Sequence, residues 1–411
     1  MNTLKFITAG NVDDGKSTLI GRLLYDSDSI HTDQLGILEK HKKREGGKVD
    51  LSLITDGLRA EREQGITIDV AYKYFSTLKR KFIIADAPGH EQYTRNMITG
   101  ASNSDLIILM VDARKGITVQ TKRHASIGSL MGIKKAIVAV NKIDMVGYSQ
   151  EIFDRITGDF EKLKNDLNYD EIIYIPVSAL LGDNVVEKSE KTKWFAGKPL
   201  LSTLETISIE SAESLDSRFQ VQWVIRPKND THHDYRGYAG QILSGKYQVG
   251  DVVKILPSGN VTTISTIEKN QQGVEVGSAG DNVVIHLADN IDVSRGDHII
   301  KIGHEPYESY NHKAWICWLD NNDLNPEKTY LLQHRFSTVR VKIQSVEQKW
   351  DVNNWNFTGA EQIKQNDIAK VSLRTNNRLF YDSFEKNIRT GNAILIDETS
   401  YNTVAALMFL N

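Results

Sequence analysis

In the first half of the chain, short runs of apolar residues alternate with longer segments that carry an apolar stripe. The apolar runs, rich in Ile and Val, predict β-strands at residues 4–9, 81–85, 106–111, 135–140 and 172–176. The striped segments predict helices at residues 18–25, 120–131 and 150–167. This alternation predicts an α/β domain with helices on both faces of a mostly parallel sheet. Ligands of such sheets bind beyond the carboxyl ends of the strands, so residues that follow a strand are the first site candidates.

The pattern changes after residues 203–214, and from residue 218 onward the segments are short, β-like and separated by Gly or Asn. One set of predicted strands covers residues 219–225, 238–244, 251–256 and 282–287, and a second covers 314–319, 336–344, 367–373 and 392–397. Runs of short strands without helices are typical of small antiparallel β-barrels. With a break near residues 303–311, we expect the α/β domain at 1–210, a first barrel at 211–304 and a second barrel at 305–411.

The composition is that of an ordinary globular protein and excludes only a few functions. The chain has 411 residues, enough for about two to four domains, and its net charge of -3 does not favour a nucleic-acid binder. The single cysteine, Cys317, excludes an internal disulfide and a cysteine-rich zinc site. No apolar stretch reaches about 18 residues, and the N-terminus lacks a secretory signal pattern. We therefore expect a cytoplasmic protein without a membrane partner.

A candidate phosphate-binding loop follows the first predicted strand. Residues 10–17 fit the pattern G-x-x-x-x-G-K-[ST] and lead into a predicted helix, which is the context that this motif requires. Glycines let backbone N–H groups turn toward phosphates, and the helix N-terminus adds the positive end of its dipole. We expect Lys16 to neutralise the β- and γ-phosphates during catalysis, and Ser17 to bind Mg²⁺. The predicted nucleotide contacts are Gly10, Asn11, Val12, Asp13, Asp14, Gly15, Lys16, Ser17 and Thr18.

A second motif follows the predicted strand at residues 81–85, where the chain reads Asp-Ala-Pro-Gly-His. We expect Asp86 to hold Mg²⁺ through a water molecule and the backbone N–H of Gly89 to approach the γ-phosphate. An imidazole at His90 can orient the attacking water, so His90 is predicted to be catalytic together with Lys16. The alternative is a loop histidine with a purely structural role.

Two further motifs predict a site for guanine. Residues 141–144 read Asn-Lys-Ile-Asp and follow the strand at 135–140; the Asp144 carboxylate can accept from N1 and N2 of guanine, a donor pair that adenine lacks. Asn141 would tie the base to the phosphate loop, and the stem of Lys142 would cover the ring. After the strand at 172–176, the backbone N–H of Ala179 would donate to guanine O6. The predicted base contacts are Asn141, Lys142, Asp144, Ser178, Ala179 and Leu180.

With GTP and Mg²⁺ as the predicted ligands, Thr67 is a candidate third metal ligand. It lies in Gly65-Ile66-Thr67-Ile68, between the first helix and the strand before Asp86. A threonine there can give its hydroxyl to Mg²⁺ and its backbone N–H to the γ-phosphate, which orders the segment with GTP and loosens it with GDP. The alternative is that Thr67 begins a strand.

In this order the motifs resemble those of the translation-factor GTPases, which include elongation factors Tu and 1-alpha. In these proteins a GTP-binding domain precedes two β-barrels, so the resemblance implies the same architecture along essentially the whole chain. A narrower resemblance is to the GTPase subunit of bacterial sulfate adenylyltransferase (ATP sulfurylase). It is carried by residues 10–26, 56–74, 82–100, 112–116, 178–184 and 236–240.

The chain also departs from these patterns. Elongation factor Tu usually has His-Gly-Lys where this chain has Asp14-Gly15-Lys16, and Ala87 stands where the sulfate adenylyltransferase family more often has threonine. The stretch 226–236 is extended by Thr231-His232-His233, which we interpret as a loop insertion and not a metal site.

The narrower resemblance implies a partner and a reaction. The GTPase subunit of that family pairs, as a heterodimer or a larger assembly, with a small catalytic subunit that makes adenylyl sulfate and pyrophosphate from ATP and sulfate. GTP hydrolysis would drive this uphill reaction through a coupled conformational change. Two alternatives remain: a carrier of aminoacyl-tRNA, which would need a basic surface on the barrels, and a GTPase with another regulatory partner.

Overall fold

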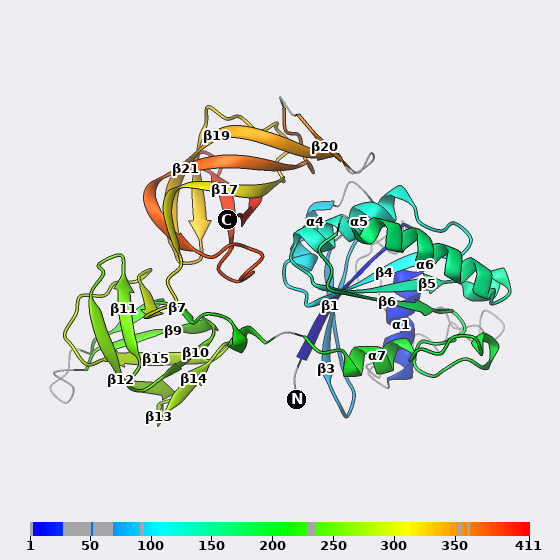
Figure 1. Ribbon diagram of the computed structural model, residues 1–411, viewed down its shortest axis with the longest axis horizontal. Coiled ribbons are helices and arrows are strands. Elements are labelled where there is room, and N and C mark those ends of the chain that lie inside the picture. Colours follow the sequence, from blue (N-terminus) through cyan, green and yellow to red (C-terminus); the bar gives the residue numbers. More distant parts are fainter. Residues whose placement is uncertain are drawn as a thin grey trace. The chain divides into compact units, whose positions relative to one another are not determined.

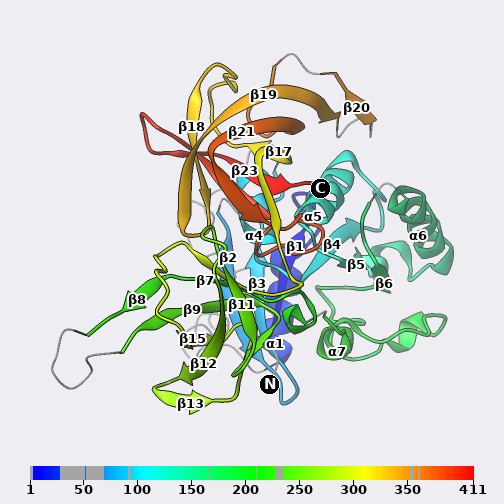
Figure 2. The same ribbon diagram turned by 60° about the vertical axis from the view of Figure 1, so that its left-hand side comes forward.

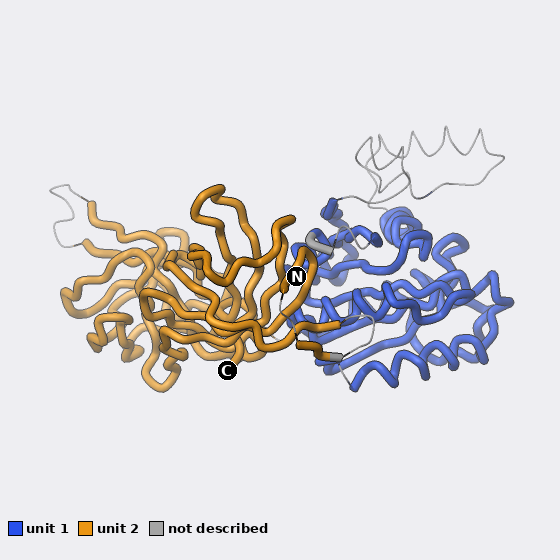
Figure 3. The backbone as a smooth tube through the Cα atoms, turned by 90° about the horizontal axis from the view of Figure 1, so that it is seen from above, with its two compact units in different colours: residues 1–209, 352–355 blue, residues 210–351, 356–411 orange. Residues whose placement is uncertain are grey.

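The computed structural model describes residues 3–27, 51, 69–90, 94–165, 167–209, 211–227, 235–351, 356–359 and 362–411. The described parts form two compact units, one within residues 3–209 and the other within residues 211–411 (Figure 3). The change of pattern that the sequence shows after residues 203–214 therefore coincides with the division between these units.

A six-stranded sheet forms the centre of the first unit, with the strand order β2-β3-β1-β4-β5-β6. All neighbouring strands are parallel except β2 and β3, which are antiparallel. Every residue of the central strand β4 is buried, as expected for a parallel strand with helices on both faces. The strands are β1 (Thr3–Ala9), β2 (Ala71–Ser76), β3 (Lys81–Asp86), β4 (Leu106–Asp112), β5 (Lys135–Asn141) and β6 (Glu171–Pro176).

Helices cover both faces of this sheet. In Figure 1, α1 and α7 lie on one face, and α4, α5 and α6 lie on the other. Side chains of α1 and α7 share a buried apolar cluster with alternate residues of β1, such as Leu4 and Phe6. The helices are α1 (Lys16–Asp26), α4 (Thr94–Ala101), α5 (Val119–Leu130), α6 (Gln150–Lys164) and α7 (Leu200–Thr206), with 3₁₀ turns at Ile143–Val146, Glu190–Thr192 and Ala212–Ser214.

The first part of the second unit is a barrel of short antiparallel strands. Its six-strand path β11-β16-β7-β9-β15-β12 is closed by pairing of β11 with β12, and β8, β10, β13 and β14 form short additional pairings. The strands are β7 (Arg218–Gln220), β8 (Trp223–Ile225), β9 (Gly237–Ser244), β10 (Lys246–Gln248), β11 (Val252–Leu256), β12 (Val261–Lys269), β13 (Gln272–Val274), β14 (Val276–Ser278), β15 (Asn282–Leu287) and β16 (His298–Lys301).

The second part of this unit is another closed barrel. Its path β18-β22-β23-β17-β21-β19 is closed by pairing of β18 with β19, and β20 extends the edge at β19. Figure 2 shows the long neighbouring strands β19 and β21 that dominate this barrel. The strands are β17 (Tyr307–Trp318), β18 (Thr329–His334), β19 (Ser337–Asp351), β20 (Asn356–Thr358), β21 (Ile368–Tyr381), β22 (Asn392–Asp397) and β23 (Thr403–Phe409).

The observed architecture confirms the predicted fold class, an α/β domain followed by two antiparallel barrels. The single strand predicted at residues 219–225 is wrong, because β7 ends at Gln220 and β8 begins at Trp223. Between the two strands, the backbone N–H of Val221 donates to the backbone oxygen of Asp297, and neither residue belongs to a strand. The domain boundaries at 210 and 304 stay predictions. Both barrels belong to one compact unit, which contains no division near residue 304.

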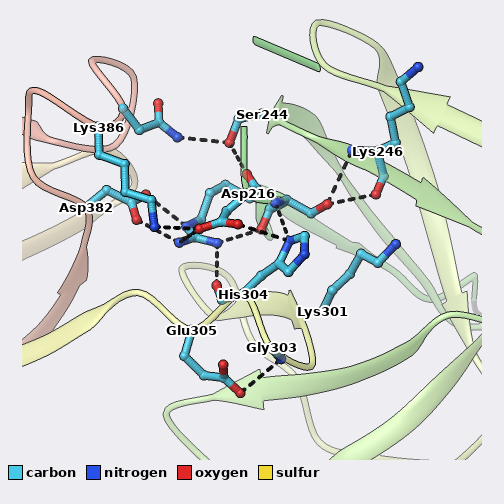
Figure 4. A network of polar contacts seen from close by, with 12 residues as sticks. Asp216, Ser244, Lys246, Lys301, Gly303, His304, Glu305, Asp382 and Lys386 are labelled. Carbon is cyan, nitrogen blue, oxygen red and sulfur yellow. Dashed lines mark hydrogen bonds and ion pairs between the residues drawn. The ribbon is translucent and has the colours of Figure 1, made fainter. Parts of the chain in front are cut away.

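A buried ion pair joins the two barrels. The Arg218 guanidinium on β7 makes two hydrogen bonds to Asp382, just after β21, at 2.9 Å and 2.7 Å, and both side chains are at most 3% exposed. Around this pair, Thr390 donates to Asp382, and Asn387 donates to Ser244. Figure 4 shows Ser244 and Asp382 within this network of polar contacts. A buried pair is tolerated only when such hydrogen bonds replace the lost hydration. This network fixes one barrel against the other.

Candidate functional site

The phosphate loop has the geometry that its glycines predict. It connects the end of β1 to the start of α1, and Gly15, the residue before α1, has a φ of 95°. That left-handed conformation is strained for any residue with a Cβ. A Cβ at Gly15 would also lie 2.3 Å from the side-chain nitrogen of Asn141. Only glycine therefore fits at this position.

Lys16 lies over the loop that it belongs to. Its Nζ donates to the backbone oxygens of Gly10 and Asn11, at 2.8 Å and 3.0 Å. The side chain is buried, and burial lowers the pKa of Lys16 below its ordinary value, opposed by the nearby carboxylates of Asp86 and Asp14. The sequence thus folds so that the one lysine of the motif points into the concave side of the loop. Ser17 and Thr18, in the first turn of α1, are half-buried.

Asp14, in the phosphate loop, has an incompletely paired carboxylate. Its Oδ2 accepts from the backbone N–H of Asn11 at 2.8 Å. Its buried Oδ1 has no hydrogen-bond partner among the described residues. Burial accordingly raises the pKa of Asp14, because the charged form loses hydration that is only partly replaced.

The segment 86–90 lies directly against the phosphate loop. Asp86 ends β3, is buried, and accepts a hydrogen bond from the Thr8 hydroxyl at 3.2 Å. A Cβ at Gly89 would lie 2.5 Å from Lys16 Nζ and 2.7 Å from the oxygen of Gly10, so a glycine is needed for this close approach. His90 is exposed. Lys16, Asp86 and the first turn of α1, which carries the hydroxyls of Ser17 and Thr18, therefore lie close together.

Asn141 connects three loops through one side chain. Its amide nitrogen donates to the backbone oxygen of Asp14 at 2.7 Å, and its amide oxygen accepts from the backbone N–H of Ala179 at 2.9 Å. Both bonds are buried. The first residue of the predicted base motif thus positions the phosphate loop and the segment after β6 at the same time.

Lys142 lies beside the phosphate loop and is held there by charge. Its φ is 60°, and its Nζ donates to the backbone oxygen of Asp13 and lies 3.1 Å from the carboxylate of Asp112. Arg114 also bonds to Asp112 with two nitrogens, at 3.0 Å and 2.6 Å. Burial alone would raise the pKa of Asp112, but the hydrogen bonds from Arg114 and Lys142 outweigh it and hold this pKa well below its usual range.

The remaining base-site residues border the same region. Asp144 is half-buried in the 3₁₀ turn Ile143–Val146. Ser178 is buried, its hydroxyl accepts from the N–H of Leu181, and Leu180 is exposed. From α1, Arg22 donates to the backbone oxygens of Ala179 and Leu180, which fixes the segment after β6 against the phosphate-loop helix.

Comparison with protein families identifies the first unit. Residues 1–214 match the family model described as "Elongation factor Tu GTP binding domain", which covers more than half of the chain. Residues 311–409 match the model described as "GTP-eEF1A C-terminal domain-like". The chain therefore contains a GTP-binding domain of the translation-factor type.

Relatives along nearly the full length define the family more narrowly. The chain is 46% identical to the sulfate adenylyltransferase subunit 1 of Francisella tularensis subsp. novicida, over 99% of this chain and 86% of the relative. It is 47% identical to the protein of that name from Alteromonas mediterranea, over 99% and 87%. The chain belongs to the sulfate adenylyltransferase subunit 1 family. It is also 48% identical to the bifunctional enzyme CysN/CysC of Mycobacterium tuberculosis, over 99% of this chain and 67% of that protein.

Membership of the sulfate adenylyltransferase subunit 1 family favours the predicted GTPase subunit over the alternative, a carrier of aminoacyl-tRNA. The relatives named above do not bear the name of an aminoacyl-tRNA carrier.

Among the residues that the structure describes, no helix is long and apolar enough to cross a membrane. Thr67 and the inserted residues 231–233 lie outside the described residues.

Sequence reasoning missed several residues that support this site in a sulfate adenylyltransferase subunit 1. The ion pairs of Asp112 with Arg114 and Lys142 were not predicted, although residues 112–116 contributed to the family resemblance. Gln120 and His124 on α5 were also missed. Their contacts depend on how α5 packs against the segment after β3, which no local pattern reveals.

Proposed function

We propose that this chain is the GTP-hydrolysing subunit of a sulfate adenylyltransferase. In that enzyme a separate catalytic subunit would join sulfate to the α-phosphorus of ATP, with pyrophosphate as the leaving group, and GTP hydrolysis here would drive the reaction. The observation that carries the proposal is family membership at 45–48% identity together with the convergence of four loops on Lys16 and Asn141.

In the proposed complex, the phosphates of GTP lie in the loop Gly10–Thr18. Lys16 Nζ, which now bonds to two backbone carbonyls, would instead bond to the phosphate oxygens. Charged phosphate oxygens are stronger acceptors than carbonyls, so this exchange is favourable. The N–H groups at the start of α1 add the positive end of the helix dipole.

Ser17 and Asp86 fit a magnesium ion beside those phosphates, and Thr67 is the proposed third residue. Mg²⁺ prefers oxygen ligands and keeps several waters, so one hydroxyl and one carboxylate beside phosphates are a suitable set. Its bound charge would stabilise the phosphates during hydrolysis.

The guanine base would lie between Lys142 and the segment Ser178–Leu180. Asp144 would accept from N1 and N2, and the Ala179 N–H would donate to O6. In this structure the Ala179 N–H donates to the side-chain oxygen of Asn141, so on binding GTP it would exchange this acceptor for O6. His90 would orient the attacking water.

The proposed location of the assembly is the cytoplasm.

A measurement of GTP hydrolysis with and without the catalytic subunit tests this proposal. We expect slow hydrolysis by the chain alone and clear acceleration when the catalytic subunit of a sulfate adenylyltransferase is added with ATP and sulfate. A control without sulfate separates stimulation by binding from stimulation by turnover. The proposal is wrong if the chain hydrolyses GTP at the same rate in every mixture.

A further inference from the structure

A glutamine on α5 reaches the segment that carries the proposed catalytic histidine. Thr118 caps α5, with reciprocal bonds between Thr118 and Thr121, and this fixes the first turn of the helix. From that turn the amide nitrogen of Gln120 donates to the backbone oxygen of Gly89 at 3.1 Å. The same nitrogen lies 2.9 Å from Nε2 of His124, one turn further along the helix.

The donor and acceptor roles in this group follow from its chemistry. The amide nitrogen of Gln120 carries two hydrogens, and the oxygen of Gly89 accepts one of them. Nε2 of His124 then accepts the other, which makes the ring neutral with its proton on Nδ1, an atom that is buried without a hydrogen-bond partner among the described residues. His124 is buried, and burial, reinforced by the charge of Lys16, lowers its pKa to about 3. The side-chain oxygen of Gln120 accepts from Arg123.

The anchored carbonyl belongs to the peptide that joins Gly89 to His90. Gly89 has no Cβ, so its own conformational preferences leave that peptide free to rotate. Gly89 must nevertheless be a glycine, because Lys16 Nζ and the oxygen of Gly10 leave no space for a side chain. The hydrogen bond from Gln120, on the capped first turn of α5, therefore restrains the orientation of the Gly89–His90 peptide, which the glycine itself does not fix.

We propose that Gln120 is a positioning residue for GTP hydrolysis, which holds the Gly89–His90 peptide so that His90 meets the attacking water. This inference rests on the proposed GTPase function of the site. Gln120 does not touch the nucleotide in this account, so it contributes to the rate of hydrolysis and not to the binding of GDP.

The test replaces Gln120 by glutamate, which has nearly the same shape but no N–H donors and repels the oxygen of Gly89. Intrinsic GTP hydrolysis by the full chain is followed under single- and multiple-turnover conditions, and GDP affinity is measured by titration of a fluorescent GDP analogue. We expect Gln120→Glu to lower kcat at least about tenfold while KM and the Kd for GDP stay within about twofold. Gln150→Glu, at the exposed start of α6, is the matched control and should behave as the original chain.

The outcomes separate this inference from the function on which it rests. If the unsubstituted chain neither binds GDP nor hydrolyses GTP, the proposed function itself fails. If it hydrolyses GTP and Gln120→Glu has an unchanged kcat, only the positioning role is wrong. A Kd for GDP that worsens as much as kcat falls also overturns that role, because it means general support of the pocket. Gln120→Met, which removes the donors without adding charge, repeats the test if the glutamate variant unfolds.

Discussion

At the scale of single residues, the site depends on a few side chains that each serve more than one loop. Asn141 is the clearest example, since its two buried hydrogen bonds join residues far apart in the sequence. The sequence predicted that Asn141, Lys16 and Asp86 lie together, because their motifs follow strands, and strands of a parallel sheet end at one edge. It did not identify Asp112, Gln120 or His124 as parts of the site, because their partners are set by tertiary packing.

Asn141→Ala should lower both stability and nucleotide affinity. The change leaves the backbone oxygen of Asp14 and the N–H of Ala179 buried without their partner, at a cost of about 1–3 kcal/mol each. We expect a lower melting temperature and weaker binding of GDP and GTP alike, measured by thermal unfolding and nucleotide titration. Asn103→Ala, at an exposed position of the same unit, is the control. Equal melting temperatures for the two variants would contradict the linking role.

Lys16→Ala should distinguish triphosphate from diphosphate chemistry. Removal of the ammonium group takes away the charge that would balance the β- and γ-phosphates, so GTP turnover should fall by about 100-fold or more. GDP binding should fall less, because GDP lacks the γ-phosphate. Lys162→Ala on the exposed face of α6 is the control. A normal rate of hydrolysis in Lys16→Ala would disprove the phosphate-loop assignment.

At the scale of elements, prediction succeeded where a strand is buried on both sides. The strand predicted at residues 106–111 is observed as β4, which ends one residue later, at Asp112. It was predictable because a continuous apolar run is the pattern of a central parallel strand. The edge strand β2, where Tyr72 and Tyr74 are exposed, was not predicted, and neither were the short helices α4 and α7. In the second barrel, the predicted strand 314–319 is the end of the longer β17, whose first half is largely exposed.

The second barrel and its junction with the first contain buried histidines, which predict a pH dependence of stability. Burial lowers the pKa of His334 to about 4, that of His312 to about 4 and that of His298 to about 3. An unfolded histidine has a pKa of about 6.5, so below that pH the unfolded chain binds protons that the folded chain excludes. Stability should therefore be highest above about pH 6.5 and fall as the pH decreases toward 4.

Urea unfolding followed by tryptophan fluorescence measures this dependence. The urea midpoint at pH 5 should be lower than at pH 7.5. The salt-bridged Asp397, whose pKa is lowered to about 2 by Lys328, acts in the same direction but only at more acidic pH. His334→Gln should reduce the difference between the two midpoints. Identical midpoints for the original chain at both pH values would contradict the burial of these histidines as neutral groups.

At the scale of the whole molecule, the chain combines a GTP-binding domain with a pair of barrels joined by Arg218 and Asp382. The order of an α/β domain and two barrels was predictable, because periodicity and turn residues change sharply near residues 203–214. The join between the barrels was not, since a buried arginine and aspartate 164 positions apart leave no local pattern. Family membership then supports the proposed reaction, which no motif spacing identifies.

The most direct test of the central claim is formation of adenylyl sulfate by this chain together with the catalytic subunit of a sulfate adenylyltransferase. Pyrophosphate release from ATP and sulfate is measured with GTP, with GDP and without a guanine nucleotide. The account predicts that GTP increases both the rate and the final yield, that GDP does not, and that Lys16→Ala removes the increase. Equal release of pyrophosphate under all three conditions would contradict the account.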